Sequence, residues 1–255
     1  MCMNKLGGIF KTLFGGEKSL CYQNDIEETE EILNETVILD SSIDNGYQHV
    51  QILIDNGHGD STLGKRSPYS AYGIEPAIDF YEYKWNREIA NRIVNELTSM
   101  GYSASLLVPE LKDVSLSERV KRVNAVCDKH GVKNVILVSI HANAAGNGDK
   151  WMTAKGWSTY TTIGQTNSDK LAEYLYAEAE KNFIGRKIRT DKQDGDKDWE
   201  DSFYICRKTK CIAVLTENFF YDNEDDVRYI LSEEGKDAVV KTHVDGIIKF
   251  IERNY

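Results

Sequence analysis

The sequence lacks long apolar runs and a surplus of positive charge, and each absence excludes a class of protein. No run of about 18 or more apolar residues occurs in its 255 residues, so a transmembrane helix is not expected. The formal net charge is -10, whereas nucleic-acid binding depends on clustered Lys and Arg that displace counterions from phosphates. Nucleic acid is therefore not an expected partner.

The sequence also lacks cysteines in a paired CxxC spacing. Its five cysteines are Cys2, Cys21, Cys127, Cys206 and Cys211. An odd number without that spacing favours reduced, mostly buried thiols over a disulfide framework or a cysteine-based zinc site. A redox bridge between Cys206 and Cys211, which flank an expected turn between two strands, is the lesser alternative.

Residues 1–47 are expected to form an N-terminal extension and acidic linker that is poorly ordered or docked, ahead of a folded domain at residues 48–255. Residues 1–16 carry apolar side chains at helical spacing. Lys11 and two Gly-Gly pairs interrupt the apolar core that a signal peptide needs, so no convincing export signal is present. An amphipathic helix in peripheral contact with a membrane and a disordered tail are the other interpretations.

Hydrophobic periodicity predicts alternating strands and helices in the rest of the chain. Strands are expected at residues 49–54, 103–108, 134–140, 157–162, 203–206 and 212–216, and helices at 82–100, from 115 onward, 168–182, 224–232 and 234–253. Residues 186–201 are polar and contain glycine, so we expect a surface loop there. The repeated strand–helix–strand order predicts an α/β fold with helices on both faces of a largely parallel sheet.

Two histidines and a glutamate lie where an expected strand ends or an expected helix begins. His58 follows the first strand after a sharp turn, His141 comes just past the third, and Glu82 lies in the first turn of a helix. The carboxyl ends of parallel strands meet at one sheet edge, where ligands bind. A catalytic zinc site needs three such nitrogen or oxygen ligands and one open position. His58, Glu82 and His141 therefore match the ligand set of a zinc site.

A fourth residue, Glu217, follows an apolar strand and is expected at the same edge. There it could take a proton from a water molecule and return it to a leaving amine. Burial by the apolar strand would raise its pKa, which suits this exchange. Taken singly, such residues have simpler interpretations, because a lone histidine usually packs and a first-turn glutamate complements the helix dipole. Their convergence on one edge favours a metal-dependent hydrolase.

Five segments together resemble the zinc-dependent N-acetylmuramoyl-L-alanine amidases of the type 3 family. They are residues 55–59, 82–90, 116–124, 139–144 and 215–220, in a similarity that runs in order from about Val50 to Phe250. The resemblance implies a single three-layer domain with a mixed, mostly parallel six-stranded sheet and helices on both faces. It places one zinc ion on His58, Glu82 and His141, and catalysis on Glu217. Family members commonly have proline where this chain has Asn56, a change expected to alter the turn more than the metal site.

The reaction that the resemblance implies is hydrolysis of the amide between the lactyl group of N-acetylmuramic acid and L-alanine of the stem peptide. Peptidoglycan is then the expected partner, bound by a monomer without a small organic cofactor. Candidate substrate-binding residues are Asn143, Lys65, Arg66, Arg186 and Arg189, the last four because their cations could meet stem-peptide carboxylates. A solvated loop is the simpler interpretation of these cations.

Two other functions stay open at this stage. A zinc peptidase or another amide hydrolase would keep all four site residues and recognise a different acyl group. A non-catalytic wall-binding module would have no chemical reason to keep them. The protein is expected to be made in the cytoplasm of a bacterium or a phage-infected cell and to act on the cell wall or periplasm, with a secreted form left open. Phage lysin and host cell-wall enzyme are equally compatible with this pattern.

Overall fold

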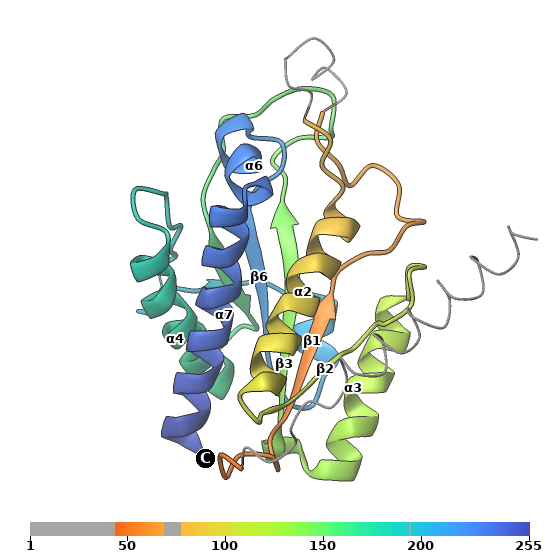
Figure 1. Ribbon diagram of the computed structural model, residues 1–255, viewed down its shortest axis with the longest axis vertical. Coiled ribbons are helices and arrows are strands. Elements are labelled where there is room, and N and C mark those ends of the chain that lie inside the picture. The colour runs from red at the N-terminus through yellow and green to blue at the C-terminus, as the bar shows by residue number, and fades with distance from the viewer. Residues whose placement is uncertain (1–43, 69–77, 194) are drawn as a thin grey trace, which may run out of the picture. The chain divides into compact units, whose positions relative to one another are not determined.

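The computed structural model describes residues 44–68, 78–193 and 195–255, which form a six-stranded sheet flanked by helices (Figure 1). The strands are β1 (Gln51–Asn56), β2 (Ser103–Leu106), β3 (Val135–Asn143), β4 (Ser158–Thr161), β5 (Trp199–Glu200) and β6 (Ile212–Phe220). The helices are α2 (Glu82–Ser99), α3 (Leu116–His130), α4 (Asn167–Asn182), α5 (Tyr204–Lys208), α6 (Glu224–Leu231) and α7 (Glu233–Asn254), with a 3-10 turn at Val132–Asn134. The expected α/β fold is confirmed.

The sheet is mixed but mostly parallel, in the order β2-β1-β3-β6-β4-β5. Strands β2, β1, β3 and β6 run parallel to one another, whereas β4 pairs antiparallel with β6 and parallel with β5. The central strand β3 is rich in Val, Ile and Leu because both of its faces are covered. Its carboxyl end therefore lies between those of β1 and β6.

Helices cover the two faces of the sheet unequally. Helices α2, α4 and α7 pack on one face, where the larger core includes Ile136, Val138 and Ile140 of β3 (Figure 1). Helix α3 and the short α5 pack on the other face, with Val135 and Leu137 of the same strand. Because side chains alternate between faces along a strand, His141 projects to the thinly covered α3/α5 side. The same alternation sends Glu217 of β6 to that side.

The thicker layer depends on close approach between α4 and α7. A Cβ atom at Gly246 would come within 2.8 Å of the Leu175 side chain, so glycine is needed where the two helices meet. Helix α4 begins with a capping box in which Thr166 and Asp169 satisfy each other's backbone donors. The start of α4 also contacts the amino end of β6, where the Ala213 amide donates to Ser168 Oγ at 3.1 Å.

Two expectations for the region between β4 and β6 are wrong. Residues 203–206, expected as a strand, run into helix α5, and the expected loop at 186–201 contains strand β5. Ile205 and Cys206 are consecutive, yet both pack in the α3/α5 core, which a helix allows and a strand does not. A short apolar run cannot distinguish strand from helix by its periodicity. Cys206 and Cys211 consequently flank a helix end, and both are free thiols, as is Cys127.

Most of the predicted N-terminal extension, including residues 1–16 and the first two cysteines, lies outside the described residues. The division at residue 47 stays a prediction. None of the helices in the described part is long and apolar enough to cross a membrane.

Candidate metal centre

Glu82 lies between two histidine rings at the carboxyl edge of the sheet. Its Oε1 is 3.0 Å from Nδ1 of His141, and its Oε2 is 3.2 Å from Nε2 of His58. The two rings are nearly perpendicular, with centroids 4.9 Å apart. One ligand atom from each of the three residues lies within 4.8 Å of the others. The structure thus brings the three predicted ligands together.

The turn that carries His58 depends on glycines at both sides. A Cβ atom at Gly57 would come within 2.1 Å of the His141 ring, and one at Gly59 within 2.1 Å of the Asp113 backbone. His58 itself has a φ of 68°, in the left-handed region that non-glycine residues rarely adopt. The segment therefore accepts local strain to aim this imidazole at Glu82.

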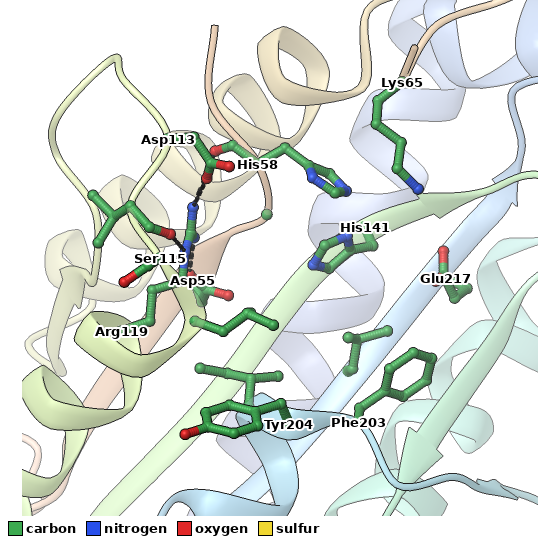
Figure 2. A pocket seen from close by; sticks show the side chains of 15 residues that line it. Asp55, His58, Lys65, Asp113, Ser115, Arg119, His141, Phe203, Tyr204 and Glu217 are labelled. Atoms are coloured by element: carbon green, nitrogen blue, oxygen red, sulfur yellow. Dashed lines mark hydrogen bonds and ion pairs between the residues drawn. The ribbon is translucent and has the colours of Figure 1, made fainter. Parts of the chain in front are cut away.

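A buried ion pair beneath this turn holds it in place. Nη1 of Arg119, on α3, lies 2.5 Å from Oδ1 of Asp55, and both side chains are only 2% exposed. Nη2 of the same guanidinium donates to the His58 carbonyl at 3.2 Å and to Asp113 at 3.0 Å (Figure 2). Ser139 donates to the second Asp55 oxygen at 2.6 Å. Arg119 thus connects α3 to the backbone of a predicted ligand.

Glu82 is held from its own helix and from β3. Asn86, one turn later on α2, donates to the Gly57 carbonyl at 3.0 Å and reaches Glu82 Oε1 at 3.5 Å. The Ala142 amide donates to the same oxygen at 3.3 Å. Burial raises the pKa of Glu82, but the hydrogen bond with His141 and the interaction with the nearby His58 ring outweigh burial and hold that pKa well below its usual range. Glu82 is therefore an ionised carboxylate, as a metal ligand must be.

Glu217 lies across from His141 in the β3–β6 ladder. Both residues fall within strands rather than past them, because β3 and β6 extend beyond their expected ends to Asn143 and Phe220. Burial raises the pKa of Glu217 to about 7, opposed by the nearby charges of His141, Lys65 and Arg189. Its Oε2 is buried without a hydrogen-bond partner among the described residues. A carboxylate with a pKa near the working pH suits proton exchange.

Glu217 and the two histidines line a cavity of about 370 Å³. Figure 2 shows His58, His141, Glu217 and the end of Lys65 along its upper side. The opposite wall is largely apolar and comes from α3, β6 and the segment around α5, namely Val114, Leu116, Phe203, Tyr204, Ile205 and Leu215. The cavity therefore has one wall that carries the titratable residues and one that is largely apolar.

The family model for N-acetylmuramoyl-L-alanine amidases of the Amidase_3 type matches residues 52–249. The chain belongs to this family. The chain is also similar to the endolysin of Bacillus phage SPP1, with 26% identity over 205 residues. That alignment covers 78% of this chain and 65% of the endolysin. A second relative is the N-acetylmuramoyl-L-alanine amidase CwlM of Bacillus licheniformis, 27% identical over 203 residues, with 78% of this chain and 68% of CwlM covered.

Solved structures of N-acetylmuramoyl-L-alanine amidases share the fold. The N-acetylmuramoyl-L-alanine amidase from Clostridium difficile 630 aligns with a TM-score of 0.67 and 23% identity, over 82% of this chain and 100% of that chain. The amidase AmiC2 of Nostoc punctiforme aligns with a TM-score of 0.63 and 22% identity, over 80% of this chain and 98% of that chain. At these identities, the likeness supports the architecture alone.

The candidate substrate-binding residues divide into two groups according to whether the side chain has a polar partner among those described below. Lys65 lines the cavity, and Arg189 lies over the rings of Trp199 at 4.9 Å and Phe220 at 5.1 Å. The remaining three contact their own surroundings. Arg66 donates to the Tyr81 hydroxyl at 3.1 Å, Arg186 pairs with Asp225 at 3.0 Å, and Asn143 accepts from the Ala144 amide at 2.8 Å. A substrate role for all five stays a prediction.

The sequence motifs did not single out the residues that support the ligands. Arg119 and Asp55 lie inside the quoted segments, but nothing in their spacing shows that they meet in three dimensions. Asn218 follows Glu217 and donates from the far face of the sheet to the His141 carbonyl at 2.9 Å. Asn218 lies inside the quoted segment 215–220, but neither that segment nor its place beside Glu217 shows this contact.

Proposed function

We propose that the protein is a zinc-dependent amidase that hydrolyses the bond between the lactyl group of N-acetylmuramic acid and L-alanine of the peptidoglycan stem peptide. The observation that carries the proposal is a buried, ionised Glu82 between His58 and His141, with Glu217 beside them on β6. Family membership supplies the substrate class. The chain spans 65% of the phage endolysin, so the activity of the whole relative is carried over as part of this proposal.

Zinc suits the donor set. Two imidazole nitrogens and one carboxylate are the ligands of many catalytic zinc sites, and such sites leave a further position for water or substrate. Glu82 Oε2 lies 3.2 Å from the His58 ring but lacks hydrogen-bond geometry to it or to any other described group. That buried oxygen is available to a cation. A zinc ion held there supplies a Lewis acid for the amide carbonyl and lowers the pKa of water.

The protein's own groups then divide the reaction between them. Glu217 accepts a proton from the water that attacks the lactyl carbonyl carbon, and it returns that proton to the nitrogen of L-alanine as the C–N bond breaks. Its burial and raised pKa allow both transfers near neutral pH. Asn86 and Arg119 act indirectly, since they hold Glu82 and the His58 turn. The products are a free lactyl carboxylate and a stem peptide with a free amino terminus.

The test is digestion of purified peptidoglycan with zinc-loaded protein, with chelator-treated protein and with Glu217→Ala. We expect zinc-dependent release of stem peptides that begin with L-alanine, while glycan strands stay intact. Glu217→Ala should keep zinc and lose roughly 10²–10⁴-fold in kcat. Cleavage between two amino acids would identify a peptidase instead, and wall binding without cleavage would identify a binding module.

A further inference from the structure

Three buried hydrogen-bond donors around β4 and β5 have no acceptor among the described residues. They are Oγ of Ser158, Nη1 of Arg189 and Nε1 of Trp199. The proposed amide hydrolysis uses none of them. Buried donors are normally paired, and an unpaired charged donor is especially unfavourable, so their coincidence calls for an acceptor.

The three donors lie on the same face of the sheet as Glu217. Ser158 pairs with Glu217 across the β4–β6 ladder, and paired residues project to one face. Trp199 pairs with Tyr160, which in turn pairs with Leu215 of the α3/α5 core. Arg189 is tied to this edge by its amide, which donates to the Trp157 carbonyl at 2.8 Å.

Stacking fixes the guanidinium of Arg189. Its Cζ lies 4.9 Å from the Trp199 ring centre and 5.1 Å from that of Phe220. No described carboxylate lies within ion-pair distance of it, whereas Arg186, three residues earlier, pairs with Asp225 at 3.0 Å. The Arg189 charge still reaches Glu217, because it opposes the rise in the pKa of that carboxyl. Arg189 is thus a positioned cation with an unpaired donor, and its charge acts on the candidate catalytic residue.

We propose that Arg189, with Trp199 and Ser158, forms a carboxylate-binding subsite that selects stem peptides with a free carboxylate near the scissile amide. An arginine fork matches the two oxygens of a carboxylate, and its stacked plane is already oriented for them. The inference rests on the proposed amidase function.

The distances along the sheet suit a stem peptide. Ile188, next to Arg189, bridges to Trp157 beside β4, which places the Arg189 backbone two strand spacings from β6, or about 10 Å. Its guanidinium extends back over Phe220 of β6, so this spacing is the upper limit of the distance to be covered. An extended peptide covers that distance in about three residues. A carboxylate within the first three stem residues therefore reaches the guanidinium while the lactyl amide lies at Glu217. A primary amide at the same place would accept fewer of these hydrogen bonds and would lose the ionic attraction.

The test uses two synthetic muramoyl peptides that differ only in the nearest stem carboxylate, which is a free acid in one and a primary amide in the other. Their affinities are measured by calorimetry for zinc-loaded Glu217→Gln, which binds without turnover. We expect the acid to bind about 10- to 100-fold more tightly than the amide. Adding Arg189→Met should reduce that ratio to about twofold or less, and Arg189→Lys should give an intermediate ratio, because it keeps the charge and loses the fork.

Lys187→Met is the matched control, since it removes an exposed cation from the same segment, two residues before Arg189, and should leave the preference unchanged. Equal affinities with Arg189 intact, or a preference that survives Arg189→Met, would overturn the subsite. The comparison of the two peptides needs no change at Arg189. Equal affinities would therefore overturn the subsite even if the Arg189→Met variant misfolded. Cleavage by the unsubstituted protein is scored separately. A carboxylate preference without cleavage of the lactyl amide would contradict the amidase proposal and leave the subsite standing.

Discussion

At the scale of single residues, the centre combines strain with charge. His58 and Phe219 have positive φ angles of 68°, and among the described non-glycine residues no others do. His58 is the predicted ligand in the turn after β1. Phe219 lies two residues after Glu217, at a break in the β3–β6 register. Rare backbone conformations persist where the surrounding contacts over-determine them, which is common at active sites.

Lys65 should lower the pH at which Glu217 becomes a base. Its positive charge lowers the pKa of Glu217, so Lys65→Met should raise that pKa. Because the base must be ionised, activity should increase as pH rises through this pKa. Lys65→Met should move this increase in activity to higher pH. The pH profile of kcat/KM on a soluble muramoyl peptide measures it. The control is Lys84→Met, at an exposed lysine that lies over Tyr81. It should leave the pH at which activity increases unchanged. If Lys65→Met moved the increase in activity to lower pH, the assignment of Glu217 as the base would be contradicted.

Arg119→Met should strongly destabilise the fold. The substitution leaves Asp55 buried with an uncompensated charge, which typically costs about 3–5 kcal/mol. Arg122→Met, one turn away, removes surface ion pairs with Glu110 and Glu118 and should cost much less, because such pairs are screened by solvent. Urea unfolding of both variants tests the contrast. Similar losses in the two would show that the buried pair does not anchor the His58 turn.

At the scale of elements, β6 carries different chemistry on its two faces. Glu217 projects to the cavity, while Thr216 and Asn218 project toward α7. Asn218 donates to Thr216 Oγ1 at 3.1 Å, and Thr216 Oγ1 is 2.9 Å from Nε2 of His243 on α7. Nδ1 of His243 lies 2.7 Å from the Val239 carbonyl and must donate to it. His243 Nε2 is therefore the acceptor, and the chain of hydrogen bonds links α7 to the strand that carries Glu217.

His243 should make the α7–β6 contact sensitive to acid. Burial lowers its pKa from 6.5 to about 4, so the unfolded chain binds a proton at higher pH than the folded protein does. Its contribution is complete above about pH 6.5 and is lost as pH falls toward 4, by roughly 3 kcal/mol. The free energy of unfolding should fall less steeply over this range in His243→Gln than in the unsubstituted protein. His49→Gln, at an exposed histidine, should retain the original slope. Parallel curves for all three proteins would argue against this role.

The elements that the sequence predicted well are long and have one dominant period. Helices α2, α4 and α7 and strands β1, β3 and β6 lie close to their expected positions. The failures are short: residues 203–206 had too few positions to separate the two periods, and β5 has only two residues. The three predicted ligands and Glu217 do converge, because strand ends in a parallel sheet share an edge. The contacts of Arg119 and His243 depend on packing between distant elements, which no local pattern contains.

At the scale of the whole molecule, the centre draws on both layers of helices. Helix α2 supplies Glu82 from one face, and α3 supplies Arg119 from the other. Metal binding should therefore stabilise the entire fold rather than a single loop. Zinc at about 100 times its Kd should add about 2.7 kcal/mol to the free energy of unfolding.

Thermal unfolding with and without zinc measures this linkage. Glu217→Ala should keep the zinc-dependent increase in Tm, because Glu217 is not a predicted ligand, and His141→Ala should lose it. An increase retained by His141→Ala, or lost in Glu217→Ala alone, would show that the ligand assignment is wrong.

Hydrolysis of the lactyl–L-alanine amide is tested most directly with a defined muramoyl-L-alanyl peptide in water enriched in ¹⁸O, followed by mass spectrometry of the products. An amidase should place one labelled oxygen in the lactyl carboxylate and none in the peptide, and the reaction should stop when zinc is chelated. Label in a carboxylate of the peptide would mean that the protein cleaves between amino acids. That result would contradict the proposed amidase function, and so would a substrate that stays intact while the protein holds zinc.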